Sequence, residues 1–168
     1  MDDHTPPPIP EALFSAFHEG RFVTCDACAC DLATETDAYQ VQKTWKHGEV
    51  VFEIALCLSC MMEAMSFLSK ESMEALRLFH MEHYRPSDAF DCCHFCRKDF
   101  GPDGEYEISG VCAGLFLARP PATMCGECAA KVQEKLSRAT RDGWGEFLDR
   151  NVPGVPETMV PDGVPAGF

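Results

Sequence analysis

A duplicated arrangement of four Cys-x-x-Cys pairs constrains the fold of this chain more than any other feature. The pairs are Cys25/Cys28 and Cys57/Cys60, followed by Cys93/Cys96 and Cys125/Cys128. Each cysteine of the first two pairs has a counterpart 68 residues later. Two such pairs, separated by a stretch of strand-forming residues, are typical of a metal site with four thiolate ligands, most often zinc. The sequence therefore predicts two Zn²⁺ ions per chain, one in each half.

The repeat extends beyond the cysteines to apolar and hydroxyl residues, which indicates that the two halves have similar folds. The same offset relates Leu56 to Met124, Leu68 to Leu136, Ser69 to Ser137, Leu76 to Trp144 and Phe79 to Phe147. Because units of about 60 residues commonly need a metal or a disulfide to be stable, we expect a small, metal-stabilised α+β fold of two tandem units. The predicted division is a flexible arm over residues 1–10, a first zinc unit with an N-terminal helix over 11–86, a second zinc unit over 87–150 and an extended Pro/Gly-rich tail over 151–168.

Local patterns predict the elements of each half. In the first half we expect a short amphipathic helix over residues 11–22, a hairpin with strands over 39–45 and 50–56, and a helix after Cys60 that restarts at a cap, Ser69, and ends before Pro86. In the second half we expect strands over 105–112 and 115–118, then a helical region over 129–148 that the glycines beside Trp144 weaken.

This order of elements, with a first Cys-x-x-Cys on a knuckle, then a hairpin, then a second pair at the start of a helix, resembles the treble-clef zinc finger. The resemblance covers residues 23–84 and 91–150. It implies that the two pairs of each half hold one metal: Cys25, Cys28, Cys57 and Cys60 in the first, and Cys93, Cys96, Cys125 and Cys128 in the second. One departure is that the glycine often found after the second knuckle cysteine is Ala29 in one half and Arg97 in the other. The chain is also similar to uncharacterised bacterial proteins with two four-cysteine sites.

Two other ligand schemes stay open at this stage. A cross-braced arrangement would join Cys25/Cys28 with Cys93/Cys96, and the remaining pairs with each other, as in RING-like folds. Iron in a rubredoxin-like site would use a similar spacing of pairs, although a helix beginning at the second pair favours zinc.

The charge and hydropathy of the chain argue against nucleic acid and membranes as partners. The 168 residues carry a formal net charge of −13, and eight thiolates around two Zn²⁺ ions would make the protein more acidic still. Nucleic-acid binding depends on Lys and Arg, so a regulator that binds nucleic acid is a disfavoured alternative. We find no export signal and no apolar run of membrane-spanning length, and we therefore expect a cytoplasmic protein without a membrane partner, in which cysteines stay reduced.

No catalytic motif stands out, so we expect a non-enzyme. The helical region after Cys60 is rich in methionine, a residue common at adaptable binding surfaces; its methionines are Met61, Met62, Met65, Met73 and Met81. The leading interpretation is an intracellular interaction module or adaptor that binds a protein, a homodimer through the helical faces being one form of that interaction. The alternative is a redox sensor in which a cysteine outside the pairs reacts first: Cys30, Cys92 or Cys112.

Overall fold

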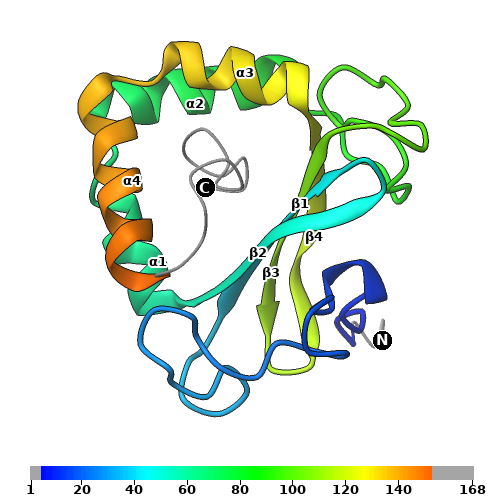
Figure 1. The fold of residues 1–168 in the computed structure, drawn as a ribbon, viewed down its shortest axis with the longest axis vertical. Helices are drawn as coiled ribbons and strands as arrows, with labels where there is room; N and C mark the ends of the chain where they lie inside the picture. The colour runs from blue at the N-terminus through cyan, green and yellow to red at the C-terminus, as the bar shows by residue number, and fades with distance from the viewer. Residues whose placement is uncertain (1–4, 153–168) are drawn as a thin grey trace.

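The two halves of the repeat contribute one β-hairpin each to a single antiparallel sheet (Figure 1). The computed structural model describes residues 5–152. The strands are β1 (Tyr39–Lys46), β2 (Glu49–Cys57), β3 (Tyr106–Ala113) and β4 (Phe116–Cys125), in the order β2-β1-β3-β4. Gln42 of β1 lies opposite Ser109 of β3. β1 and β3 both begin at a tyrosine and have 8 residues, and Gln42 and Ser109 hold the same position in the two strands. A pseudo-two-fold axis therefore passes between them.

The first hairpin confirms the predicted strands. Its turn is made by His47 and Gly48, whose φ angles of 53° and 78° are both positive, as a two-residue turn of type I′ requires. The second hairpin differs from the prediction, because β4 continues through Pro120 and Pro121 to Cys125. Proline is tolerated there because β4 is an edge strand, and the register between β3 and β4 shifts beside the two prolines.

In each half a helix begins directly after the first cysteine of the second pair and is followed by another. The helices are α1 (Leu58–Met65), α2 (Lys70–His83), α3 (Gly126–Lys135) and α4 (Arg138–Asn151). Ser69 and Ser137 cap α2 and α4, their hydroxyls accepting from Ser72 and Thr140 N–H. The predicted cap at Ser69 is confirmed. The predicted weak point at residues 142–145 is wrong, since the helical region breaks at Ser137 instead.

A cluster of hydroxyl groups joins the N-terminal end of α2 to the N-terminal end of α4. The hydroxyl oxygens of Ser69 and Ser137 lie 3.0 Å apart, and Thr140 Oγ1 donates to Ser72 Oγ over 3.0 Å. Backbone groups cross as well, since Ser69 N–H donates to Thr140 Oγ1 and Ser137 N–H to Ser72 Oγ. Ser72 and Thr140 are both fully buried. Each N-terminal turn is thus satisfied partly by the other helix.

The second helix of each half packs in the core of the other half. Phe79 of α2 belongs to one buried cluster with Phe95, Val132 and three metal-site cysteines of the second half, Cys93, Cys125 and Cys128. Trp144 and Phe147 of α4 belong to the cluster that contains the cysteines of the first half. In Figure 1, α2 accordingly runs beside α3, and the two helices are in contact. The division at residue 86 stays a prediction about independent folding.

The N-terminal segment is less helical than predicted. The only helical turn in residues 11–22 is the 3₁₀ turn η1 (Glu11–Leu13), and Phe14 is already extended. Two side chains of the first hairpin bind residues 14–16, which come directly after η1. Lys43 Nζ donates to the Phe14 carbonyl, and the Glu53 carboxylate accepts from the Ser15 hydroxyl and from Ala16 N–H. Long-range partners therefore replace the hydrogen bonds of a helix.

Residues 5–10 of the predicted arm approach β4. Leu117 N–H donates to the Pro7 carbonyl over 2.8 Å, and Ile9, which is buried, donates to Leu115. Residues 1–4 and 153–168, and with them almost all of the predicted tail, lie outside the described residues. Among residues 5–152, the structure contains no helix long and apolar enough to cross a bilayer.

Candidate metal centres

The second half brings its four predicted cysteines together. The sulfur atoms of Cys93, Cys96, Cys125 and Cys128 all lie within 4.8 Å of one another. The Cys96 and Cys125 sulfurs are 3.7 Å apart. A tetrahedral ion with metal–sulfur bonds of about 2.3 Å separates its sulfur ligands by about 3.8 Å. The sulfur positions of this group therefore fit a tetrahedral metal ion.

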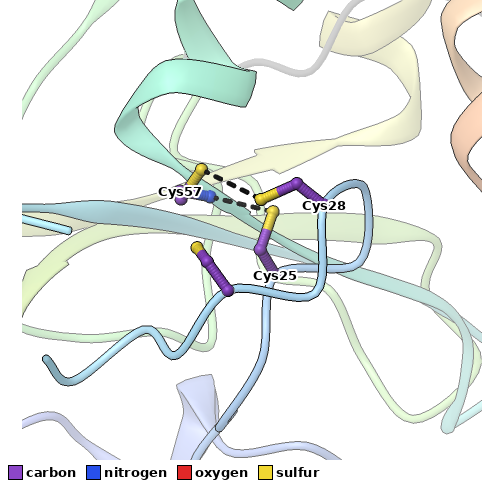
Figure 2. Close-up of side chains that lie close together, drawn as sticks. Cys25, Cys28 and Cys57 are labelled. Atoms are coloured by element: carbon purple, nitrogen blue, oxygen red, sulfur yellow. Dashed lines mark hydrogen bonds between the residues drawn. The ribbon is translucent and has the colours of Figure 1, made fainter. Parts of the chain in front are cut away.

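The first half forms a similar group with one difference. The four sulfur atoms that lie within 4.8 Å of one another are those of Cys25, Cys28, Cys30 and Cys57. Figure 2 shows Cys28 facing Cys57 and the Cys57 N–H directed at Cys25. The sulfurs of Cys28 and Cys57 are 3.7 Å apart. Cys60, which the sequence predicts as a ligand, is outside this group of four, although its thiol interacts with those of Cys25, Cys28 and Cys57. Cys30 takes its place in the group.

The two knuckles have the same backbone conformation. Cys25 N–H donates to the Cys30 carbonyl and Cys93 N–H to the Lys98 carbonyl, each over 2.9 Å. The residue after the second knuckle cysteine has a positive φ in both, 63° at Ala29 and 67° at Arg97. The left-handed conformation that glycine adopts easily is thus kept in both halves by residues that adopt it with strain.

Backbone N–H groups point at the sulfur atoms. Cys57 N–H donates to Cys25 Sγ and Cys125 N–H to Cys93 Sγ, both over 3.3 Å. Phe95 N–H also reaches Cys93 Sγ, and Cys128 N–H reaches Cys125 Sγ at the start of α3. Such hydrogen bonds favour the thiolate form that a metal ligand must take.

A polar side chain ties each knuckle to the strand beside it. Asp26 Oδ2 accepts from Ala55 N–H, while the Asp26 N–H donates to the Ala55 carbonyl. At the equivalent position His94 is fully buried, and its ring Nδ1 accepts from Thr123 N–H. The backbone N–H of His94 donates to the Thr123 carbonyl. The repeat therefore keeps this clamp with a different side chain in each half, which sequence offset alone does not reveal.

The pKa values of the metal-free thiols separate easily ionised cysteines from resistant ones. Backbone N–H bonding from Cys30 lowers the pKa of Cys28 to about 7. Burial acts to raise the pKa of Cys93, but backbone N–H groups outweigh it, and the pKa lies below its ordinary value. Burial raises the pKa of Cys125 to about 11, and burial together with neighbouring thiols raises those of Cys60 and Cys128 strongly. A metal ion must therefore displace protons from Cys60, Cys125 and Cys128 near neutral pH.

The cysteines outside the pairs have different surroundings. Cys112 is fully buried in β3, opposite Tyr39, and burial raises its pKa to about 11. Cys92 is partly exposed, and its carbonyl accepts from the Thr123 hydroxyl. Neither belongs to the two cysteine groups. The cross-braced scheme is not what the structure shows, because Cys25 and Cys93 lie in separate groups.

No protein-family model, curated protein sequence or solved structure matches this chain. The treble-clef resemblance therefore stays a prediction. The two cysteine groups, the four-stranded sheet and the four helices are what the structure shows.

Proposed function

We propose that this is a cytoplasmic zinc protein whose two ions, each held by four thiolates, stabilise the fold. The observation that supports zinc most directly is the pair of compact cysteine groups, each with one pair of sulfurs 3.7 Å apart. A closed set of four thiolates leaves no open coordination position for a substrate, so the proposed role of both ions is structural. The proposed function includes no enzymatic activity.

The wider proposal is a module that binds another protein through α2 and the sheet beneath it. Met73, Leu78 and Met81 of α2 are between 49% and 66% exposed, which is unusual for large apolar side chains on one helix. Met73 and Met81 also line a cavity of about 600 Å³ between α2 and strands β1, β3 and β4. Exposed methionines beside a cavity suit a binding surface that adapts to its partner.

The chemistry of this cavity points to a polypeptide segment with apolar side chains and carboxylates. Arg77, His80 and Arg119 line it, and among the described lining residues there is no Asp or Glu. Arg77 pairs with Glu74 of the same helix, so the positive charge offered to a carboxylate comes mainly from Arg119. Gln40, also in the lining, is 4% exposed, and its Oε1 has no hydrogen-bond partner among residues 5–152. A peptide N–H could donate to that oxygen, which a hydrocarbon ligand could not do.

The first test is metal content. Protein purified without added metal and without a metal-binding tag should hold two zinc ions per chain in native mass spectrometry and elemental analysis. Replacement of Cys57 or Cys125 by serine should remove one ion and much of the stability. A chain that folds normally without any metal would overturn the proposal.

The binding surface is tested separately with peptides displayed against the zinc-loaded protein. Selected peptides should combine apolar residues with Asp or Glu, and Met73→Glu should weaken their binding at least about tenfold, the effect of roughly 1.4 kcal/mol. Met62→Glu is the matched control, because Met62 is 62% exposed on α1 but does not line the cavity. Equal effects of the two variants would contradict this location of the surface.

A further inference from the structure

The two cysteine groups differ first at the residue two places after the second knuckle cysteine. Cys30 of the first half corresponds to Lys98 of the second. Cys30 lies in the first group of four sulfurs, whereas Lys98 places its ammonium near the thiols of Cys96 and Cys125 and pairs with Glu127 over 2.9 Å. The second centre therefore has four thiols and a cation beside them, and the first has a further thiol in the place of that cation.

The cysteines at the helix starts differ as well. In the second half Cys125 caps α3 by accepting from Cys128 N–H, and Cys128 belongs to the group of four. In the first half Cys57 is the N-cap of α1 but makes no side-chain capping bond, and Cys60 is outside the group. The thiol of Cys60 still interacts with those of Cys25, Cys28 and Cys57. Five thiols therefore surround the first centre.

We propose that the first centre holds its metal through Cys25, Cys28 and Cys57 and that Cys30 and Cys60 are interchangeable as the fourth ligand. This inference rests on the two metal sites of the proposed function. The exchange is a ligand substitution: a bond from Cys30 Sγ to the metal forms, the bond from Cys60 Sγ breaks, the Cys30 thiol releases its proton to water and the Cys60 thiolate takes one up. No electrons are transferred and no other reactant is needed.

The consequence is a difference in kinetic lability between the two ions. Each exchange frees the fourth coordination position from one thiol before the other holds it, and a competing ligand can enter the position at that moment. The second ion has no such thiol, because Lys98, which pairs with Glu127, stands at the repeat position of Cys30. The first centre should therefore release its ion faster than the second.

The test compares serine variants of the full chain by native mass spectrometry and by the thiolate charge-transfer absorption of the Co²⁺-loaded protein. Cys30→Ser and Cys60→Ser should each keep two ions with four-thiolate spectra, since the other cysteine completes the site. The double variant should lose the first ion or keep it with a three-thiolate spectrum. Cys128→Ser, the repeat equivalent of Cys60→Ser, should weaken the second site at once.

Zinc release to a chromogenic chelator gives the second measurement. The parent protein should show a fast and a slow phase of equal amplitude, and the fast phase should be lost in Cys30→Ser. If Cys60→Ser loses its first ion as readily as Cys128→Ser loses its second, the inference is wrong although the two sites stand. If the parent protein binds no metal, the proposed function itself fails.

Discussion

At the scale of single residues, the site depends on backbone conformation as much as on the cysteines. The knuckles orient their sulfurs through a left-handed residue, Ala29 or Arg97, and through N–H groups that reach Sγ. A non-glycine residue in this conformation costs about 1–2 kcal/mol. In the folded protein that cost is offset by metal coordination and by the knuckle hydrogen bonds from Cys25 N–H to the Cys30 carbonyl and from Cys93 N–H to the Lys98 carbonyl.

We predict that Ala29→Gly stabilises the zinc-loaded protein by about 0.5–1 kcal/mol, because relief of the left-handed strain exceeds the greater entropy that glycine gives the unfolded chain. The free energy of unfolding in denaturant, at a fixed zinc concentration, measures the change. Ala27→Gly is the control: Ala27 is in the same knuckle without a positive φ, and its replacement should destabilise. A loss of stability in Ala29→Gly would show that the strain is not stored at this position.

Metal affinity should fall with pH in a manner set by the thiol pKa values. Cys60, Cys125 and Cys128 have raised pKa values, so near pH 7 they are protonated in the metal-free protein and each must release its proton on binding. Cys28, with a pKa of about 7, adds a further released proton only below that pH. As the pH is lowered, the apparent metal affinity of the first site should therefore fall more steeply below about pH 7 than above it. Competition with a chelator across pH 5.5–8.5 measures the slope, and a constant slope would contradict the role of Cys28.

At the scale of elements, the helices are positioned by close contacts that intrinsic propensity does not describe. A Cβ atom on Gly143 of α4 would come within 2.7 Å of the Phe67 ring, next to the end of α1. A Cβ on Gly110 of β3 would come within 2.6 Å of Leu13 in η1. Both glycines therefore provide space for a neighbouring element, and both are required by packing rather than by backbone conformation.

The two glycines of α4 should respond to alanine in opposite directions. Gly145→Ala should stabilise by roughly 0.5–1 kcal/mol, because alanine is the better helix former and nothing lies within 4 Å of the added methyl group. Gly143→Ala gains the same propensity but must displace Phe67, and overpacking of this kind typically costs about 1–3 kcal/mol. The midpoint of thermal unfolding, measured for both variants and the parent protein, tests the two predicted stability changes. Equal stabilisation by both would show that α4 does not approach Phe67 this closely.

At the scale of the whole molecule, the halves are interlocked. They share the pairing of β1 with β3, the hydroxyl cluster between α2 and α4, and two buried clusters that each contain the last helix of the opposite half. A separated half would expose the edge of its central strand and lose the aromatic residues that complete its core.

We predict that residues 1–86 alone do not form a cooperatively folded zinc unit, because Trp144 and Phe147 come from the other half of the chain. Circular dichroism and thermal unfolding of this fragment with zinc should show no cooperative transition. Mixing with residues 87–168 should restore one. A cooperative transition with one zinc ion in the isolated fragment would instead support two independently folding units.

The sequence by itself determined the local features of this protein. The cysteine spacing, the His47-Gly48 turn and the Ser69 cap each act through neighbours a few residues away, so a pattern in the chain is enough to locate them. Glu11 to Phe22 shows the limit of such patterns, because its amphipathic spacing favours a helix while Lys43 and Glu53, distant in the chain, bind its groups instead.

Only the tertiary structure decided which elements meet. The presence of Cys30 among the sulfurs, the exchange of α2 and α4 between halves and the break at Ser137 all depend on contacts between residues far apart in the chain. In a duplicated sequence each half contains the same apolar pattern, so either half could cover either core. The choice is made by packing and by the joined sheet, whose free energy belongs to the whole chain and not to any segment.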